Sequence, residues 1–407
     1  MKLKDIVTFV SKSVVPQRGA KYNLYSLPSF DENKSAEVLD GAEIQSNKYD
    51  VPNKCILFNK LNVRFKRVWR INNSDSNKIA STEFLPLVVN EDVVDYQYCY
   101  YLLISDEITN YLCGQNSNTS GSHKRIDPQN FLNIDIHLPK MPIQKAIGKT
   151  LSNIDRKIEL NKRINDNLEA MAKQLYDYWF VQFDFPNEEG KPYKSSGGAM
   201  VWNEKLKREI PQGWHCGTLL DIAEYTNGLA CQKYRPTDNN KLPVIKIKEM
   251  HDGLSADTEW VNADIPDDVK VFDGDVLFSW SASLEIMLWA YGNGGLNQHI
   301  FKVTSKNGYP RSFYFYQLIH YVGVFKQIAE ARKTTMGHIT QDHLRQSTIV
   351  LPPNIDVANK LEEKLGPIFD AIVKNNQEIM ALTKQRDKLL PLLMNGQATV
   401  NYHLSAY

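Results

Sequence analysis

One short segment of the sequence, residues 60–78, combines the side-chain types that bind nucleic acid. Ammonium and guanidinium groups neutralise phosphates, and amides and guanidinium groups bond to the edges of bases. A single acidic residue, Asp75, stands among the basic residues and asparagines of this segment. Those residues are Lys60, Arg64, Lys66, Arg67, Arg70 and Lys78, with Asn62, Asn72, Asn73 and Asn77. The segment is a candidate DNA-binding surface, and a solvated basic loop is the alternative.

Four other segments extend this prediction along the chain. Residues 114–125 and 330–338 are rich in basic, amide and hydroxyl side chains, and residues 230–236 and 245–250 add further cations. Ordinary polar surface is the alternative for each position. The predicted DNA-binding residues are Arg64, Lys66, Arg67, Arg70, Asn116, His123, Lys124, Arg125, Gln232, Lys233, Arg235, Lys246, Lys248, Lys333, Thr334, Thr335 and His338.

Catalytic and metal-binding motifs are not recognisable in the sequence. IGKT at 147–150 lacks the upstream glycine of a phosphate-binding loop, because position 143 is isoleucine. LPPN at 351–354 holds the residues of an amino-methyltransferase box only in scrambled order. Three histidines have no companion at a metal-ligand spacing: His299, His338 and His343. The sequence therefore predicts a binding protein with no catalytic residue and no metal.

Length and composition set the broad class of the protein. A chain of 407 residues is long enough for two or three domains, and a net charge of +1 disfavours a promiscuous polyanion binder. The five cysteines form no C-x-x-C pair, and we find neither a membrane-length apolar segment nor a cleavable signal peptide. We expect a cytoplasmic protein with reduced thiols.

An internal repeat organises the whole chain. Four short segments recur in the same order about 200 residues later, which a single chance match would not do. The sequence therefore predicts two copies of one α+β unit. The pairs are LKDI at 3–6 with LLDI at 219–222, CILFN at 55–59 with DVLFS at 275–279, YCYYLL at 98–103 with YFYQLI at 314–319, and HKRIDPQNFLNIDIHLP at 123–139 with HITQDHLRQSTIVLP at 338–352.

Each copy closes with apolar residues repeated every three or four positions, which predicts a long helix with a coiled-coil seam. Charged residues such as Arg156, Lys157 and Glu159 fall off that seam. Either helix alone would expose its apolar stripe, so we expect the two helices to pair. The predicted seam residues are Ile147, Leu151, Ile154, Ile158, Asn165, Leu168 and Leu175 on the first helix, and Leu361, Leu365, Ile368, Ile372, Asn375, Leu382 and Leu389 on the second.

Chain order predicts that the helices are antiparallel. Each helix is about 50 Å long at about 1.5 Å per residue, and antiparallel pairing lets the second unit join the two helices without spanning that length. We therefore predict two similar domains at opposite ends of an antiparallel coiled coil, related by a pseudo-twofold axis. In this register Asn165 lies opposite Asn375, and such a polar pair in an apolar seam fixes the register.

The same considerations give a segment map. A stretch rich in glycine, proline, serine and lysine separates the first helix from the second domain and reads as a linker. The predicted segments are a first globular domain at 1–142, the first long helix at 143–183, the linker at 184–212, a second globular domain at 213–352, the second long helix at 353–395 and a tail at 396–407. Strands are expected at 55–58, 85–89, 244–247, 276–278 and 300–303, with helices at 96–111 and 313–331.

Long motifs spread over nearly the whole chain carry a family resemblance. They are LFSWSASLEIMLWAYGNGGLNQHIFKV at 277–303, HITQDHLRQSTIVLPP at 338–353, IDRKIELNKRINDNLEAMAKQLYDYWFVQFDFP at 154–186, GKPYKSSGGAMVWNE at 190–204 and LLPLLMNGQATV at 389–400. Together they closely resemble the DNA-specificity subunit of type I restriction–modification systems. The resemblance is sharper in the second half of the chain.

The resemblance implies that each globular domain is a target-recognition domain reading one half of a bipartite, asymmetric site in double-stranded DNA. The helices would space the two halves and recruit two methyltransferase subunits, to which restriction subunits add. It implies a non-catalytic chain with no cofactor of its own, because S-adenosylmethionine, ATP and Mg²⁺ would belong to the partner subunits. No membrane partner is expected.

The first long helix ends in LYDYWFVQFDFP, residues 175–186, where six of twelve residues are aromatic. Such a block is costly to leave in water, so another surface must cover it. Given the resemblance, we expect Trp179, Phe180 and Phe183 to pack partly on Leu361 and partly against a methyltransferase subunit. The alternative is that these rings only fill the junction between the helix end and the neighbouring domain.

Two other functions remain compatible with a two-domain coiled-coil protein. A scaffold joining two protein-binding modules would show no salt-dependent affinity for DNA. A methyltransferase or nuclease fused to recognition domains would act on DNA as a purified single chain.

Overall fold

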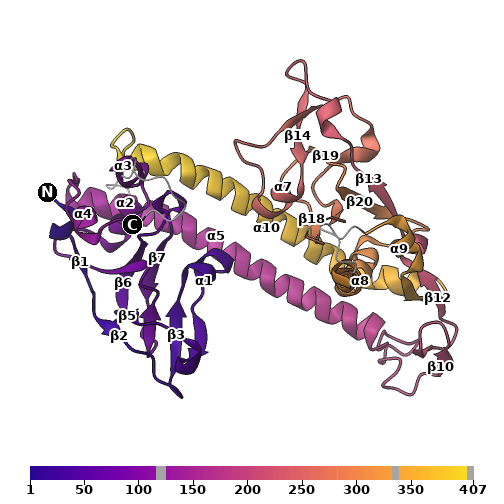
Figure 1. Cartoon of the computed structure of the whole chain (residues 1–407). Coiled ribbons are helices and arrows are strands. Elements are labelled where there is room, and N and C mark those ends of the chain that lie inside the picture. Colours follow the sequence, from indigo (N-terminus) through magenta and orange to yellow (C-terminus); the bar gives the residue numbers. More distant parts are fainter. Residues whose placement is uncertain (116–124, 282, 332–338, 401–407) are drawn as a thin grey trace. The chain divides into compact units, whose positions relative to one another are not determined.

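The computed structural model describes residues 1–115, 125–281, 283–331 and 339–400. The chain divides into two compact units, the first Met1–Lys157 with Leu382–Tyr407 and the second Ile158–Ala381. Each unit holds one mixed helix–sheet domain together with a part of both long helices, α5 (Met141–Tyr176) and α10 (Asp356–Met394) (Figure 1). The unit boundaries cut the long helices, because each helix part packs on the domain beside it.

Unit 1 contains two sheets. The first is antiparallel with strand order β1 (Val7–Phe9), β9 (Phe84–Val89), β6 (Lys54–Asn59) and β7 (Val68–Asn72). The second has the order β2 (Ser13–Val14), β5 (Lys48–Asp50), β8 (Lys78–Ala80), β3 (Lys21–Tyr25) and β4 (Glu37–Asp40), with β3 and β8 parallel. The helices of the domain are α1 (Leu27–Glu32), α2 (Tyr96–Leu103), α3 (Asp106–Gln115) and α4 (Pro128–Leu132).

Unit 2 also contains a four-stranded antiparallel sheet and a second, mixed sheet. Its antiparallel sheet has the order β13 (Ala223–Asn227), β20 (Ile300–Ser305), β17 (Val276–Ser279) and β18 (Ile286–Leu288). Its second sheet has the order β15 (Trp260–Asn262), β14 (Lys241–Ile245), β19 (Gly294–Leu296) and β16 (Lys270–Val271), again with one parallel pair, β14 and β19. The remaining elements are α6 (Leu219–Ile222), α7 (Ile247–Asp252), α8 (Arg311–Ala331), α9 (Gln341–Gln346), and β12 (His215–Thr218) paired with β21 (Thr348–Leu351).

The two sheets with matching strand order confirm the predicted repeat down to single residues. Ile56 of β6 lies between Leu87 and Arg70, and its counterpart Val276 of β17 lies between Val303 and Leu288. Arg70 on edge strand β7 and Leu288 on edge strand β18 therefore occupy equivalent positions. Both central strands are apolar because helices cover one face of the sheet and the second sheet covers part of the other.

The predicted helix register is confirmed within unit 2. The Asn375 amide donates to Asn165 Oδ1 and the Asn165 amide donates to Asn376 Oδ1, each at 2.8 Å. Asn161 lies one turn before Asn165 on α5, and its amide donates to Glu378, which lies about one turn after Asn375 on α10. Since partners advance in opposite directions along the chain, the helices are antiparallel. Mutual amide bonds satisfy polar groups that the seam would otherwise bury unpaired.

The same register holds within unit 1, where Asp155 of α5 accepts a hydrogen bond from Arg386 of α10 at 3.2 Å. All fourteen predicted seam residues are buried or half-buried, whereas Arg156, Lys157 and Glu159 are exposed. Three apolar residues of α5 fall off the seam and are exposed: Leu160, Ile164 and Met171. These three side chains, here called the α5 outer stripe, were not singled out by the heptad pattern.

Gly148, within the IGKT segment, has a packing role in α5. A Cβ atom there would lie 2.7 Å from Asp95 Oδ1 and 2.9 Å from the backbone nitrogen of Tyr98. Asp95 caps the start of α2, so the glycine lets the long helix pass close to that capped end. The helical setting and the close contact account for this glycine without a bound phosphate.

Three predicted elements differ from those observed. The helix expected at 96–111 is interrupted after Leu103, and Ser105 Oγ accepts a hydrogen bond at the start of α3. The strand expected at 244–247 ends at Ile245, because Glu249 bonds back to the Lys246 nitrogen and starts α7. The linker contains a hairpin of β10 (Met200–Asn203) and β11 (Arg208–Pro211). All three differences arise from local hydrogen bonding.

Candidate nucleic-acid interface

Most predicted DNA-binding cations of unit 1 have partners within the chain. Arg67 donates two hydrogen bonds of 2.7 Å to Asp31, and Lys66 Nζ lies 2.6 Å from Asp106. Arg64 is exposed, with its guanidinium 4.7 Å from the ring centroid of Phe65, itself an exposed aromatic residue. Arg64 with Phe65 is therefore the part of this segment best placed to meet a nucleic acid without first breaking an ion pair.

The structure corrects the prediction that Arg70 is a DNA-binding residue. Its guanidinium lies 4.1 Å from the ring centroid of Tyr100, donates to Gln97 Oε1 at 2.6 Å, and lies 3.4 Å from Asp155 of α5. Strand β7 is the edge of its sheet, and this side chain points from that edge to the long helix. Arg70 therefore joins the domain to the helix instead of facing a base.

Seven predicted residues lie outside the described part of the chain: Asn116, His123, Lys124, Lys333, Thr334, Thr335 and His338. Arg125, at the end of the first of these loops, is described. It donates to both carboxylate oxygens of Glu83 at 2.8–3.1 Å, and this hydrogen bonding raises the pKa of the arginine. A nucleic acid would have to compete with Glu83 for this exposed group.

Unit 2 exposes a cluster of cations and aromatic rings. Gln232, Lys233, Arg235 and Lys248 are exposed as polar side chains, whereas Lys246 is paired with Glu259 at 2.5 Å. The hydrogen bond from Lys246, with its charge and a smaller effect of Arg235, lowers the pKa of Glu259. Arg235 therefore lies close enough to this ion pair to influence it.

Sequence reasoning missed the rings of this cluster. Tyr234 and Trp260 are 41% and 46% exposed, and Lys241 Nζ lies 4.6 Å from the Trp260 ring centroid. The backbone nitrogen of Asn262 donates to the Tyr234 carbonyl at 2.8 Å, which holds the 231–235 segment beside β15. We call Lys233, Tyr234, Arg235, Lys241 and Trp260 the basic–aromatic surface. The sequence signal that could have identified this cluster is QKYRP at 232–236, where a tyrosine stands between two cations.

Potential metal-ligating side chains are scattered among the described residues. No group of three or more histidine, cysteine, aspartate or glutamate side chains there is arranged to hold an ion. His343 Nδ1 accepts a hydrogen bond from the Thr340 nitrogen at 3.0 Å at the start of α9, which is a helix-capping role. A binding role is therefore inferred from the exposed cations and aromatic rings of the surface.

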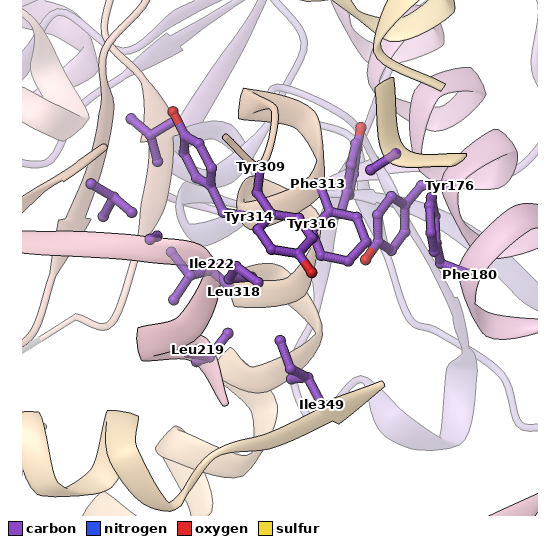
Figure 2. Packing of buried hydrophobic residues seen from close by; sticks show 14 of the residues in the cluster. Tyr176, Phe180, Leu219, Ile222, Tyr309, Phe313, Tyr314, Tyr316, Leu318 and Ile349 are labelled. Carbon is purple, nitrogen blue, oxygen red and sulfur yellow. The ribbon is translucent and has the colours of Figure 1, made fainter. Parts of the chain in front are cut away.

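The aromatic block at the end of α5 is covered by unit 2 itself. Trp179, Phe180 and Phe183 are 4%, 5% and 1% exposed. The centroid of the Phe180 ring lies 4.9 Å from that of Phe313, in an edge-on contact, and 5.9 Å from that of Trp214. Figure 2 shows Phe180 beside Tyr176 and Phe313. Because no more than one twentieth of each side chain is accessible, the expected contact with a methyltransferase subunit is wrong for these rings. They fill the junction between the helix end and the domain.

Tyr176 in this junction is buried with a hydroxyl group that has no hydrogen-bond partner among the described residues. An unpaired buried hydroxyl costs about 1–3 kcal/mol. We expect Tyr176→Phe to keep the ring packing. Because the buried unpaired hydroxyl is removed, the free energy of unfolding should rise by about 1 kcal/mol. Urea titration of both proteins checks this, with Tyr178→Phe as the half-buried control; a destabilised Tyr176→Phe variant would show that the hydroxyl is satisfied.

Comparison with known proteins decides the family. The family model of the type I restriction modification DNA specificity domain matches residues 1–170 and 211–385, which include both repeats and most of both long helices. The chain belongs to this DNA-specificity family. The match falls twice on the chain, in agreement with the duplicated sheet topology.

Known members are similar over most of their length. The specificity subunit of the type I restriction enzyme MjaIX from Methanocaldococcus jannaschii is 25% identical over 335 residues, covering 80% of this chain and 74% of that protein. The HindI specificity subunit from Haemophilus influenzae is 23% identical over 424 residues, covering 86% and 90%. The crystal structure of an S subunit from M. genitalium has the same fold, with a TM-score of 0.60 at 13% identity over 97% and 95% of the two chains.

No helix among the described residues of this specificity-family chain has the length and apolar character needed to cross a membrane.

Proposed function

We propose that this chain is the DNA sequence-specificity subunit of a cytoplasmic type I restriction–modification enzyme. Each domain reads one half of a bipartite, asymmetric site in double-stranded DNA, and the paired helices determine the spacing between the halves. The observation that carries the proposal is the duplicated domain, whose four-stranded antiparallel sheet recurs with the same strand order, each copy packing on a part of both long helices. Two similar domains joined by paired helices suit the recognition of two short sequences in one site.

Two methyltransferase subunits are the proposed direct partners, with restriction subunits added to them. S-adenosylmethionine, ATP and Mg²⁺ are assigned to those subunits, and this chain is non-catalytic. The α5 outer stripe supports a protein partner, because Leu160, Ile164 and Met171 are 47%, 37% and 59% exposed on a helix whose seam is already occupied. Apolar side chains spaced along one helix face suit contact with a helix of another protein.

Sequencing methylated adenines in a host that expresses this chain with its methyltransferase tests the function. We expect every methylated site to contain two specific half-sites separated by a constant number of base pairs. Deletion of this gene alone should abolish that methylation, whereas the purified chain without partners should methylate nothing. A methylation pattern unchanged by the deletion would contradict the proposal, and binding without sequence preference would favour the scaffold alternative.

The basic–aromatic surface gives a residue-level prediction. Arg235→Ala should weaken DNA binding and, if this residue contacts a phosphate, reduce the slope of log affinity against log salt by about one. If it contacts a base instead, discrimination at one position of the site should fall by about 1–3 kcal/mol. Fluorescence anisotropy of the assembled methyltransferase complex, across salt concentrations and single-base variants, measures both.

The matched control is Lys364→Ala, which removes an exposed cation from α10. It should change neither the salt dependence nor the base preference. Equal effects of both substitutions would show that net charge matters and that the basic–aromatic surface is not the interface.

A further inference from the structure

A pocket of about 490 Å³ in unit 2 has no occupant from the described chain. It lies between edge strand β18, helix α8 and both long helices, and Leu288, Tyr316 and Phe369 contribute to its walls. Asp166, Glu169 and Lys173 of α5 provide its charged groups. The pocket therefore combines an apolar interior with an ionic rim.

The uncompensated charge on this rim is negative. Lys173 lies 2.5 Å from Asp177, one turn along the helix, and is thereby neutralised. Asp166 and Glu169 form no ion pair with any residue in the described ranges. Partial burial, and next the charge of Asp166, raise the pKa of Glu169. Two carboxylates without a cation partner in the described ranges, beside apolar walls, favour a cation between them.

The first repeat shows which cation fits such a place. Arg70, equivalent to Leu288, extends from edge strand β7 across the ring of Tyr100, and Tyr100 corresponds to Tyr316 in the aligned YCYYLL and YFYQLI segments. Its guanidinium and that of Arg386 are both held by the carboxylate of Asp155, at 3.4 and 3.2 Å. In unit 1 the cleft between sheet edge and long helices is thus filled by arginine from the chain itself.

Unit 2 keeps the aromatic wall of this cleft but has no arginine at the positions equivalent to Arg70 and Arg386. Leucine replaces Arg70 at position 288, and Ala172 stands where the repeat would place Arg386. In unit 1 the carboxylate of Asp155 lies on α5, the helix that directly follows that domain. In unit 2 the carboxylates that line the pocket, Asp166 and Glu169, also lie on α5, whereas the helix that follows the second domain is α10. A guanidinium group entering from outside would meet a tyrosine ring and carboxylates, as Arg70 does in unit 1.

We propose that this pocket binds an arginine side chain of one methyltransferase subunit, with its guanidinium against Tyr316 and the carboxylates of Asp166 and Glu169. The inference rests on the proposed function for the identity of the partner. Arginine is preferred to lysine because its planar group stacks on a ring while donating to carboxylates, and its aliphatic stem matches the apolar walls. Unit 1 fills its own cleft, so the two methyltransferase contacts are chemically unequal.

The first test neutralises the rim. In the full-length chain, Asp166→Asn with Glu169→Gln should weaken binding of one of the two methyltransferase copies by roughly ten- to a hundredfold, because charge-assisted hydrogen bonds are lost. Sedimentation velocity should then show accumulation of a complex with one methyltransferase copy. The melting temperature of the isolated chain should not fall. Glu159→Gln, an exposed glutamate on the same helix, is the matched control.

The second test blocks the pocket without changing charge. Ala170 lines the pocket and is exposed, so Ala170→Trp should fold normally and produce the same one-copy complex. Ala381→Trp places the same ring at an exposed position of α10 outside the pocket and should assemble like the wild type. Carbon-13 NMR of the Glu169 carboxyl group adds a direct readout, because an arginine partner should lower the pKa of Glu169 on assembly.

The outcomes separate the inference from the function on which it rests. Two-copy assembly of undiminished affinity by both pocket variants would overturn the arginine pocket and leave the specificity role intact. Equal weakening of both copies would also overturn it, because the pocket exists in unit 2. Failure of the wild-type chain to bind any methyltransferase subunit would overturn the proposed function and the inference with it.

Discussion

Phe180→Ala is expected to lower the free energy of unfolding by about 3–5 kcal/mol, the usual cost of removing a ring from a packed core. Phe180→Asp should cost more, because it also places a charge where 5% of the native side chain is exposed. The ring lies among Tyr176, Trp214 and Phe313, which have no means of closing the gap without moving the end of α5. Urea unfolding followed by tryptophan fluorescence measures the change, with Trp214 as a nearby reporter.

The neighbouring Val181→Ala is the matched control, because Val181 is 38% exposed and belongs to the same short π-helix (Asp177–Val181). Its effect should stay within about 0.5 kcal/mol. A Phe180→Asp variant that keeps wild-type stability but fails to bind the methyltransferase would contradict the packing role. Such a result would restore these rings as a partner surface.

Asp155→Ala is expected to destabilise unit 1 by about 3 kcal/mol, the lower end for removing one partner of a buried ion pair. The carboxylate accepts a 2.5 Å hydrogen bond from the Tyr101 hydroxyl and lies against two guanidinium groups. Its removal leaves Arg70, about three-quarters buried, with no carboxylate partner among the described residues, whereas Arg386 keeps only its neighbour Asp387. Thermal and urea unfolding of the full chain measure the loss.

A second substitution shows whether unpaired charge causes the loss. Asp155→Leu combined with Arg70→Leu should be more stable than Asp155→Leu alone, because the guanidinium left without a counter-charge is removed with its partner. Glu159→Ala, an exposed glutamate one turn further on α5, is the control and should change stability by less than about 0.5 kcal/mol. Additive effects of the two leucine substitutions would show that Asp155 and Arg70 do not interact.

The long-range organisation of this protein was predictable because the sequence contains a heptad spacing of apolar residues and several recurring segments. Heptad spacing gave the seam, and the order of the chain gave the antiparallel direction that the amide bonds between Asn165 and Asn375 confirm. Recurring segments such as CILFN and DVLFS gave equivalent central strands in two domains. These patterns are local in sequence and depend on few distant contacts.

Individual charged residues were less predictable. Arg67, Arg70 and Arg125 belong to segments whose composition suits DNA, yet the structure gives them acidic partners 36, 85 and 42 positions away. The sequence does not show which distant carboxylate lies next to a given cation. Exposed Tyr234 and Trp260 were missed for a related reason, since aromatic residues are usually taken for core.

The sequence by itself determined the duplication, the helix pair with its register, and the resemblance to the DNA-specificity family. Only the tertiary structure decided that the aromatic block is internal and that Arg70 serves the domain–helix junction. It also decided that the matching cleft in the second unit is open and acidic. The physical reason is that periodicity reports which face of an element is buried, whereas the occupant of a space depends on side chains brought together from distant parts of the chain.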